Sequence, residues 1–500
     1  MKILFVHPLY PDSFWSFKHA LRFVSKKAAV PPLGLITVSA MLPSDWEKKL
    51  VDMNVTQLKT KDIQWADYVF LGAMHIQKES VDYVIGECLK LGKKMVAGGP
   101  LFTQEPQNYE MIDHLVLNEA EITLPLFLAD LEKGVPQKIY QSKEFSDVKT
   151  TPIPDYQLLS AKHYAFMNIQ VSRGCPFSCD FCEITTLFGH KVRMKSTEQI
   201  LSELDKLFNL KWRGNIFIVD DNFIGNKNAI KTDLLPAMKK WMQAHNFPFT
   251  FNTEASVNLS DDDELIQLMV ETGFKAVFIG IETPEEKSLH ECNKVQNKSR
   301  DLLQCIKKIQ QAGLQVSGGF IVGFDNDSPT VFQTQIDFIQ KSGIVSAMVG
   351  ILNVPKNTRL YDRLKSEDRL LSETTGNNTD LTLNYVPKMN SLELIAGYKK
   401  IIRDIYFTKP YYKRIRSLLI NYKPYKTSPV KINFVLFKAF FKSIFIIGFV
   451  NKGRSGYWKL LFWTLFRRPA LMADAIEYSI YGYHFRKVYD LRNKKSAYRQ

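Results

Sequence analysis

The sequence predicts an α/β protein with two successive βα series and a helical C-terminal region. Short apolar runs alternate with amphipathic stretches from residue 1 to about residue 370, and beyond residue 375 helices rich in aromatic residues and lysine take over. Alternating βα units fold into parallel sheets that are covered by helices. Five hundred residues exceed what one hydrophobic core organises, so two or three domains are expected.

Residues 1–145 have the rhythm of a doubly wound, Rossmann-like domain. Four short apolar runs are expected as strands: Lys2–Val6, Tyr68–Ala73, Lys94–Ala97 and His114–Leu117. Val81–Leu91 between two of them is expected as a helix, and a ligand would bind beyond the carboxyl ends of the strands. Residues 146–168 contain the prolines of Thr-Thr-Pro-Ile-Pro, so they are expected as a linker that packs on an apolar surface.

Residues 169–372 predict a partial (β/α)6 barrel of the TIM type. Six apolar runs are expected as its strands: Ile169–Ser172, Asn215–Val219, Phe249–Thr253, Ala276–Gly280, Gln315–Val322 and Met348–Val354. Five stretches between them are expected as helices: Thr197–Leu210, Ala229–His245, Asp261–Thr272, Arg300–Ala312 and Thr330–Ser342. A closed barrel of eight units needs about 250 residues, so this length suits a partial one. Residues 373–500 are expected as a basic, aromatic-rich helical C-terminal domain.

Cysteine usage and the N-terminus point to a cytoplasmic protein. The six cysteines do not make a disulfide scaffold, and three of them lie within eight positions, which suits a reducing compartment. The first residues form a short apolar run without a cleavage site, so no signal peptide is expected. No stretch of about 20 residues is apolar without interruption, so no membrane-spanning helix is expected.

Three cysteines follow the first expected strand of the barrel. Cys175, Cys179 and Cys182 have the spacing C-x3-C-x2-C. Thiolates are soft ligands suited to iron–sulfur clusters, and three of them leave the fourth iron of a [4Fe-4S] cluster open for a ligand. The alternatives are a structural zinc site or three unrelated thiols. A closed zinc site needs four ligands, and the loop offers no fourth one, because His190 lies eight residues further on.

This segment resembles the signature of the radical S-adenosylmethionine superfamily, including the aromatic Phe181 before the last cysteine. In that family the open iron binds S-adenosylmethionine, and an electron from an external reductant cleaves it to methionine and a 5′-deoxyadenosyl radical. The resemblance continues at the following strand ends and implies further contacts with S-adenosylmethionine: Asp220 and Asp221 with the amino group, Glu254 and Glu282 with the ribose, Lys294 with the carboxylate and Gly319 with adenine. A carboxylate at a strand end often caps the next helix instead, and for Asp220 and Asp221 that alternative stays open.

Residues 1–145 resemble the cobalamin-binding domain that precedes many radical S-adenosylmethionine enzymes. The matching segments are Pro31–Leu35, Val51–Asn54, Gly72–Met74, Ala97–Pro100 and Asn118–Glu121. The implied cobalamin contacts are Gly34, Asn54, Gly72, Met74, Gly98, Gly99 and Glu119. The Asp-x-His-x-x-Gly motif that supplies a histidine to cobalt is absent, Asn118 stands where the family often has glycine, and neither His7 nor His75 is assigned a ligand role. A doubly wound domain without a cofactor is the alternative.

Positive charge is concentrated at the C-terminus. From Lys409 to Gln500 there are 20 Lys or Arg against three acidic residues, a net charge of +17, whereas the whole chain carries +15. In Val430–Val450, Lys431, Lys438 and Lys442 interrupt long apolar runs, and Tyr457–Arg468 repeats the pattern. Such helices suit a membrane interface, so peripheral contact through residues 410–500 with the inner face of a membrane is expected. Nucleic acid is not expected, because a groove that follows phosphates needs no aliphatic runs; apolar faces that cap the barrel are the other alternative.

From end to end the chain resembles the family of the hopanoid 2-methyltransferases, including Phe14-Trp15, Trp65–Asp67 and Asp220–Lys227. The resemblance implies a cobalamin-dependent methyltransferase that methylates an unactivated carbon of a hydrophobic small molecule, a hopanoid lipid, through the 5′-deoxyadenosyl radical. Two alternatives remain open. One is a cobalamin-associated radical enzyme that catalyses cyclisation or rearrangement without methyl transfer, and the other is a non-catalytic cobalamin or cluster sensor.

Overall fold

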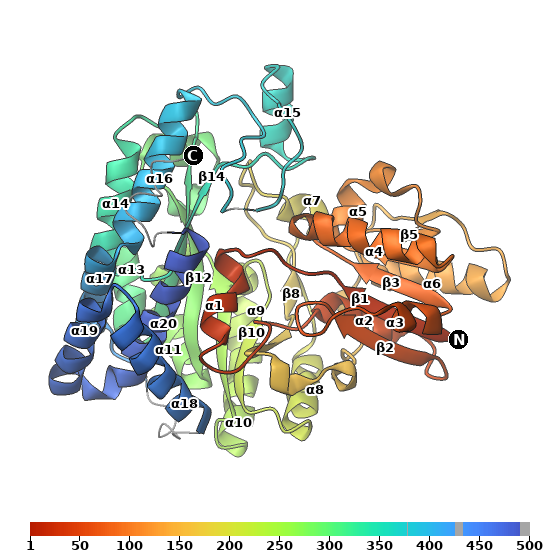
Figure 1. The fold of residues 1–500 in the computed structure, drawn as a ribbon, viewed down its shortest axis with the longest axis horizontal. Coiled ribbons are helices and arrows are strands. Elements are labelled where there is room, and N and C mark those ends of the chain that lie inside the picture. Colours follow the sequence, from red (N-terminus) through yellow and green to blue (C-terminus); the bar gives the residue numbers. More distant parts are fainter. Residues whose placement is uncertain (378, 426–433, 491–500) are drawn as a thin grey trace.

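Two parallel six-stranded sheets lie side by side in the computed structural model, which describes residues 1–377, 379–425 and 434–490. The N-terminal sheet lies at one end of the molecule and the second sheet in its middle, with most of the C-terminal helices on the far side (Figure 1). The expected α/β class with a doubly wound domain, a partial barrel and a helical C-terminal region is confirmed.

The N-terminal sheet is doubly wound. Its strands, in the spatial order β2-β1-β3-β4-β5-β6, are β1 (Lys2–His7), β2 (Glu47–Asp52), β3 (Tyr68–Gly72), β4 (Lys94–Gly98), β5 (His114–Val116) and β6 (Ile139–Tyr140). The covering helices are α2 (Leu33–Met41), α3 (Thr60–Trp65), α4 (Lys78–Lys90), α5 (Pro100–Gln104) and α6 (Ala120–Glu132). Alternate strand residues pack on opposite faces: Leu4 and Val6 share a core with α3 and α4, whereas Ile3 and Phe5 share one with α2 and α6.

The second sheet is a partial barrel. Its strands, in the order β14-β13-β12-β11-β10-β7, are β7 (Phe166–Ile169), β10 (Gly214–Ile218), β11 (Phe249–Ala255), β12 (Phe274–Glu282), β13 (Gln315–Val322) and β14 (Ala347–Ile351). The outer helices are α8 (Thr197–Asn209), α10 (Leu235–Ala244), α11 (Asp263–Thr272), α13 (Leu302–Gln311) and α14 (Val331–Ser342). Within the described residues β7 and β14 are the two edges of this sheet, so the barrel stays open on one side.

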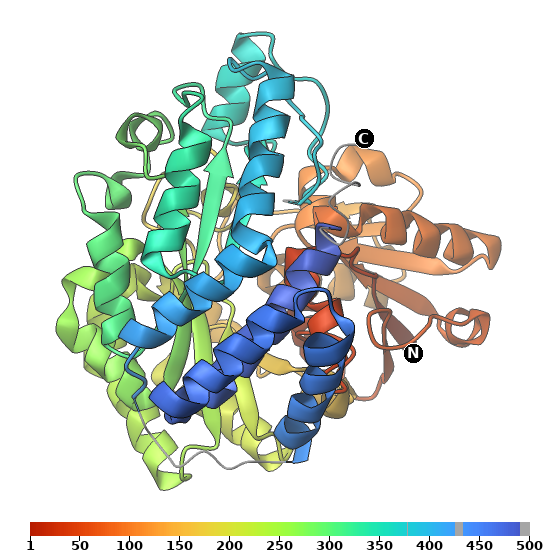
Figure 2. The same ribbon diagram turned by 60° about the vertical axis from the view of Figure 1, so that its left-hand side comes forward.

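The C-terminal helices complete the fold around the barrel. They are α15 (Arg359–Ser366), α16 (Ser391–Tyr406), α17 (Thr408–Asn421), α18 (Phe434–Ser443), the helical turn η11 (Ile444–Val450), α19 (Arg454–Arg467) and α20 (Met472–Val488). Helix α20 runs beside the short helix α1 (Lys18–Leu21), near the open side of the barrel, as both ribbon views show (Figure 2). The ring of Phe14 stacks on that of Phe485, with 4.4 Å between the centroids.

The structure differs from the sequence expectations in three respects. The first barrel strand is Phe166–Ile169 instead of Ile169–Ser172, so it begins inside the expected linker, although the rest of that linker packs as expected through the buried side chains of Val148 and Tyr156. The described part of residues 373–500 does not form a core of its own, because α16, α17 and α20 share one continuous hydrophobic cluster with the barrel strands. Strand β2 was not expected, because its Glu-Lys-Lys sequence marks an edge strand that is half in water.

The structure bears on two further expectations, which concern a membrane-spanning helix and the basic C-terminal region. No helix among the described residues is both long enough and apolar enough to cross a membrane. Lys431 and the last ten residues of the basic region lie outside the described residues.

Candidate functional site

The three cysteines lie in the loop between β8 (Ser172–Arg173) and β9 (Arg193–Met194), a short antiparallel pair at the carboxyl end of the barrel. The loop begins at Gly174, which has φ +92° and whose missing Cβ would lie 2.7 Å from the carbonyl oxygen of Lys191, so only glycine fits there. The Cys182 amide donates to the carbonyl of Cys179 (3.1 Å), and all three thiols are free and half-buried.

The chemistry of the thiols fits an iron–sulfur cluster better than one metal ion. Burial raises the pKa of the Cys182 thiol to about 12, and the neighbouring Cys179 and Cys175 thiolates add to the rise, so three thiolates require a positively charged group among them. Among the described residues, no three His, Cys, Asp or Glu side chains converge as ligands of a single ion. In a cluster each thiolate binds a different iron, so such convergence is not needed.

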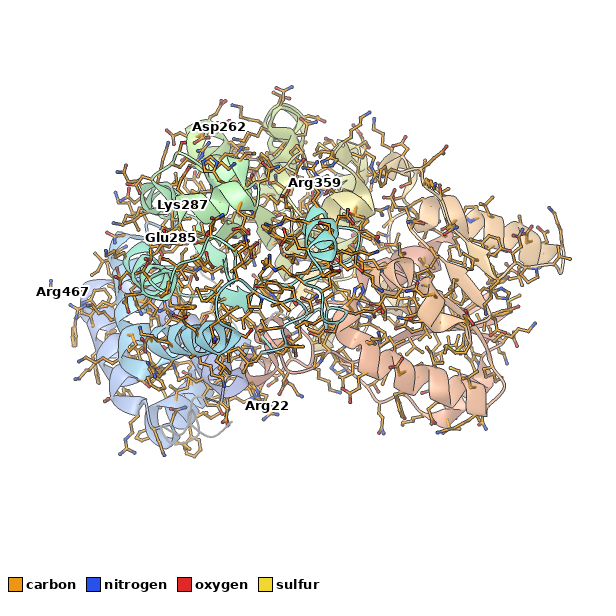
Figure 3. All side chains as sticks on the ribbon, turned by 90° about the horizontal axis from the view of Figure 1, so that it is seen from above. Arg22, Asp262, Glu285, Lys287, Arg359 and Arg467 are labelled. Atoms are coloured by element: carbon orange, nitrogen blue, oxygen red, sulfur yellow. The ribbon has the colours of Figure 1, made fainter. Side chains whose placement is uncertain are left out.

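A pocket of about 200 Å³ opens beside the cysteine loop. It is lined by Cys179, Cys182, Thr185 and His190, and by Arg359 of α15 on the other side. Arg359 lies over the middle of the molecule when this is viewed from above (Figure 3). A larger cavity of about 460 Å³ lies behind the same loop, between Pro176 and the turn around Asn222 and Lys227.

Asp220 at the end of β10 holds the start of the cysteine loop. One carboxylate oxygen accepts from the Val171 amide (2.7 Å) and the other from the Ser172 hydroxyl (2.6 Å). The side chain is buried, and burial raises its pKa to about 7. One oxygen is therefore directed to the loop backbone and the other to the Ser172 side chain, so Asp220 positions the start of the loop, and its expected contact with S-adenosylmethionine stays a prediction.

Lys294 and Glu282 form a buried ion pair next to the thiols. Lys294 Nζ lies 2.6 Å from Glu282 Oε1 and 5.9 Å from the centre of the Phe181 ring. Burial alone would lower the pKa of Lys294, but Glu282 and the thiolates of Cys179 and Cys182 hold it above its usual value. Glu282 has φ +61°, a strained conformation for a non-glycine residue, at an irregular point in the pairing of β12 with β13. A Cβ on Gly280 would collide with both members of the pair.

Two further acids lie on the same side of the barrel. Burial raises the pKa of Glu254 on β11 to about 8, and the Asp221 carboxylate adds to the rise. Burial likewise raises the pKa of Asp221 to about 6, and its charge also acts on Cys175. The expected residues Phe181, Asp221, Glu254, Glu282 and Lys294 therefore gather around the cysteine loop. Gly319 on β13 pairs with Gly280, and its missing side chain leaves room for the Phe278 ring, which a Cβ would approach to 2.9 Å.

The ligand edge expected in the N-terminal sheet lies where the strand order changes direction, between β1 and β3. Met74 is 49% exposed there, and the Tyr10 hydroxyl lies 3.7 Å from its sulfur. Asn54 shapes the loop after β1, because its Oδ1 accepts from the Tyr10 amide (2.9 Å). Gly99 has φ +98° at the end of β4. This open, glycine-bearing edge fits a large flat ligand.

The other glycines expected at this edge have different surroundings. A Cβ on Gly72 would lie 2.9 Å from the Leu35 side chain, and one on Gly98 would lie 2.5 Å from the carbonyl oxygen of Val116. Both glycines therefore serve internal packing. A Cβ on Gly34 would meet no atom within 4 Å. His75 lies 3.5 Å from the Glu105 carboxylate, and His7 packs edge-on against the Tyr10 ring.

Glu119, whose contact with cobalamin stays a prediction, is engaged by two arginines. Its carboxylate accepts from Arg173 (3.0 Å) and Arg193 (2.9 Å), the residues of β8 and β9 that flank the cysteine loop. Glu121 completes the group, and against the effect of burial Arg173 lowers its pKa to about 2. A second tie joins the Gln104 amide to Glu183, which directly follows Cys182 (2.8 Å). The ligand edge and the cysteine loop are thus held against each other.

Sequence reasoning missed two contacts of the loop. Gln296 Nε2 lies 3.7 Å from Cys179 Sγ, and the Asn293 side chain donates to the carbonyl of Ser178 (3.0 Å). Both residues come from the turn after α12 (Glu286–Glu291), more than a hundred residues along the chain, and no local pattern marks them.

Comparison with known proteins gives consistent results. Residues 169–339 match the radical SAM superfamily, and residues 358–497 match a domain of unknown function, DUF4070. An uncharacterized methyltransferase of Synechocystis sp. is 41% identical over 490 residues, which cover 97% of this chain and 91% of that protein. Hopanoid C-2 methylase of Rhodopseudomonas palustris is 34% identical over 388 residues, 76% of this chain and 73% of the methylase. The structure of the radical S-adenosylmethionine methyltransferase TsrM from Kitasatospora setae, with cobalamin and a [4Fe-4S] cluster bound, has the same fold (TM-score 0.60, 13% identity, 98% and 99% coverage).

Proposed function

Because this chain belongs to the radical S-adenosylmethionine methyltransferases, in the family that includes hopanoid C-2 methylase, we propose that it methylates an unactivated carbon of a polycyclic, hopanoid-like lipid with the help of cobalamin. One observation carries the proposal. The cysteine loop of the barrel is held next to the open ligand edge of the N-terminal sheet by the side-chain hydrogen bonds Gln104–Glu183 and Glu119–Arg173.

In this proposal the cysteine loop is the binding site of the iron–sulfur cluster. Cys175, Cys179 and Cys182 would hold three irons, and the bound cluster supplies the electron that splits S-adenosylmethionine into methionine and a carbon radical. The protein prepares this site in two ways. The ammonium of Lys294 favours thiolates over thiols, and the Gln296 amide donates toward the Cys179 sulfur (3.7 Å).

The polar groups around the loop suit the ends of S-adenosylmethionine. Lys294 matches its carboxylate, while Asp221 and Glu254 match its ammonium and its ribose hydroxyls. Glu282 holds Lys294 in place at 2.6 Å. Gly280 and Gly319 lie side by side in the pairing of β12 with β13, and their missing side chains leave room for the Glu282–Lys294 pair and for the Phe278 ring, on which a flat base could rest.

Cobalamin would lie between the two sheets, at the edge formed by Met74, Gly99 and the loop that Asn54 shapes, and when bound it supplies the methyl group. His75 is engaged with Glu105, which accords with a cobalt that takes no histidine from this chain. The buried ion pairs of Glu119 would fix the distance between the domains, because a small displacement of reacting groups is costly.

An apolar surface on the C-terminal helices supports a lipid substrate. Six phenylalanines of α18, η11 and α19 are exposed, and we call them the C-terminal apolar surface: Phe437, Phe441, Phe445, Phe449, Phe462 and Phe466. The exposed side chains of Lys438, Lys459 and Arg467 flank them. Arg467 projects from the side of the molecule opposite the N-terminal domain (Figure 3). Exposed phenylalanines with exposed cations on the same helices match an anionic membrane surface, from which the enzyme would take its substrate.

Anaerobic turnover with a pentacyclic hopanoid tests the proposal. With S-adenosylmethionine, cobalamin and a reductant that supplies two electrons per turnover, the expected products are methylated hopanoid, S-adenosylhomocysteine and 5′-deoxyadenosine in equal amounts, since one S-adenosylmethionine would donate the methyl group and another would be cleaved. The Cys179→Ala variant should form none of them. Formation of deoxyadenosine together with a rearranged, unmethylated product would show that the enzyme isomerises its substrate and does not methylate it. Turnover of straight-chain lipids alone would show that the substrate is not polycyclic.

A further inference from the structure

The inner face of the barrel is less buried than its outer face. Outward-facing strand residues such as Ile216, Phe251, Ile279 and Val349 are fully buried under the helices. The residues that alternate with them point inward and are only half-buried: Phe217, Val219, Asn252, Glu254, Phe278 and Met348. A filled barrel would bury both sets equally, so these side chains line a chamber with room for a ligand.

Trp15 reaches this chamber from the N-terminal part of the chain. Its ring packs edge-on against Phe278, with 5.1 Å between the centroids, and the side chain stays 42% exposed although its neighbour Phe14 is buried. The backbone beside it is fixed, because His484 of α20 donates to the carbonyl of Phe14 (3.1 Å) and the Phe14 ring stacks on Phe485. The indole is thus held on a rigid support with much of its surface free.

Asn252 brings a half-buried polar side chain to the same chamber. It lies on β11, two residues before Glu254, and pairs in register with Phe217 of β10 and Ala276 of β12. Its Oδ1 is buried and has no hydrogen-bond partner among the described residues. A buried acceptor left unpaired costs free energy, and rotation of the amide toward a ligand hydroxyl in the chamber would recover it.

Phe278 connects the aromatic and the polar parts. In the pairing of the strands it is the direct neighbour of Glu254 on one side and of Ser317 on the other. Trp15 and Phe278 therefore form an aromatic wall at the level of Glu254, one of the acids near the cysteine loop, and Asn252 lies one level deeper on the same inner face. An apolar body would rest on this wall, and a hydroxyl group would reach the amide.

We propose that Trp15 and Phe278 are the specificity-determining wall of the substrate chamber and that Asn252 binds a hydroxyl group on an otherwise apolar, rigid, flat substrate. The inference rests on the proposed function and narrows its substrate class from polycyclic lipids in general to those with one polar group. The wall joins two parts of the chain that are more than 260 residues apart, so the site is complete only when the N-terminal segment is in place.

Direct binding measurements test this inference independently of turnover. The probes are a pentacyclic triterpene alcohol and the matching hydrocarbon, titrated into the cluster-loaded enzyme and its variants. Trp15→Ala should weaken binding of both probes about tenfold, because an aromatic contact and its apolar area are lost. Asn252→Leu, which keeps the volume but removes the amide, should reduce the preference for the alcohol about three- to tenfold and leave the hydrocarbon unaffected.

Three further variants make the result decisive. Trp65→Ala removes an indole on the N-terminal domain that packs against lysines, so its affinities should equal those of the wild type. Iron content and circular dichroism report whether each variant is folded, and if Trp15→Ala is not, Trp15→Phe and Phe278→Leu test the wall from its two sides. Wild-type affinity in all wall variants, or an unchanged alcohol preference in Asn252→Leu, would overturn the inference. Binding that follows the prediction without any methylation would reject the proposed reaction alone.

Discussion

Glu119 of the N-terminal domain lies 3.0 Å from Arg173, two residues before the first cysteine of the loop. Both side chains are almost completely buried, and Arg193 adds a second ion pair at 2.9 Å. The domain that offers an open ligand edge is therefore joined by buried charges to the strands that carry the cysteines. Exposed ion pairs could not maintain such a junction, because water and salt screen them.

Glu119→Gln should destabilise this junction. The change leaves Arg193 without a charged partner in a buried site, which costs about 3 kcal/mol, and the thermal midpoint should fall by several degrees. Anaerobic differential scanning fluorimetry measures the effect. The matched control is Glu87→Gln, which removes a solvent-screened pair with the exposed Lys90 and should leave the midpoint almost unchanged. Equal midpoints for the two variants would show that the junction does not depend on Glu119.

Asp220→Asn should loosen the cysteine loop. An amide can accept from only one of the two donors, Val171 or Ser172, so about 1–3 kcal/mol of loop stability is lost. The iron of the loaded protein should pass to a chelator roughly tenfold faster than in the wild type. Asp205→Asn weakens a hydrogen bond from Trp241 in the outer helices and should leave iron release unchanged. If Asp220→Asn retained its iron as the wild type does, Asp220 would have no positioning role.

His484 should make stability fall in mild acid. Burial lowers its pKa from 6.5 to about 4, with a smaller contribution from His19 that the carboxylate of Asp12 opposes. Between these two pH values the unfolded chain holds the proton and the folded chain does not, so stability is unaffected above pH 6.5 and declines by roughly 3 kcal/mol as the pH falls to 4. His484→Gln removes this titration. Denaturation at pH 5 and pH 7.5 should therefore show a smaller loss in the variant, and parallel losses would contradict the assignment.

The C-terminal apolar surface should bind anionic vesicles. Phe445 and Phe466 are 66% and 79% exposed, so Phe445→Asp with Phe466→Asp should abolish co-sedimentation with vesicles that contain phosphatidylglycerol. Each nearby cation contributes about 1 kcal/mol, so Lys459→Glu should weaken binding at least fivefold. Leu89→Asp changes a similarly exposed side chain on the N-terminal domain and should have no effect. Undiminished vesicle binding by the double variant would show that the C-terminal apolar surface does not bind membranes.

Local patterns in the sequence predicted most of the strands and the position of the cysteine loop. Strand β13 was expected at Gln315–Val322 and is observed with the same bounds, because its apolar run is continuous and glycine-bearing. The charged edge strand β2 carries no such signal. Local spacing was also sufficient to predict that Cys175, Cys179 and Cys182 act together, because the three residues lie within one loop of eight residues.

The partners of single polar residues could not be predicted in this way. Asp220 stands at a strand end, where a ligand contact and a helix cap leave the same trace in the sequence, and its actual partner, the Val171 amide, lies 49 residues away. Glu119 was expected at cobalamin because of its neighbours in the chain, but Arg173, 54 residues away, determines its orientation. The contact of Trp15 with Phe278 likewise depends on how two domains pack.

Metal analysis combined with an assay of reductive cleavage tests whether the three cysteines hold a cluster that splits S-adenosylmethionine. The anaerobically reconstituted wild type should hold about four irons and four sulfides per chain, and after reduction it should convert S-adenosylmethionine to 5′-deoxyadenosine, whereas Cys179→Ala should lose both properties. A wild-type protein that binds zinc in place of iron, or that leaves S-adenosylmethionine intact after reduction, would contradict the account.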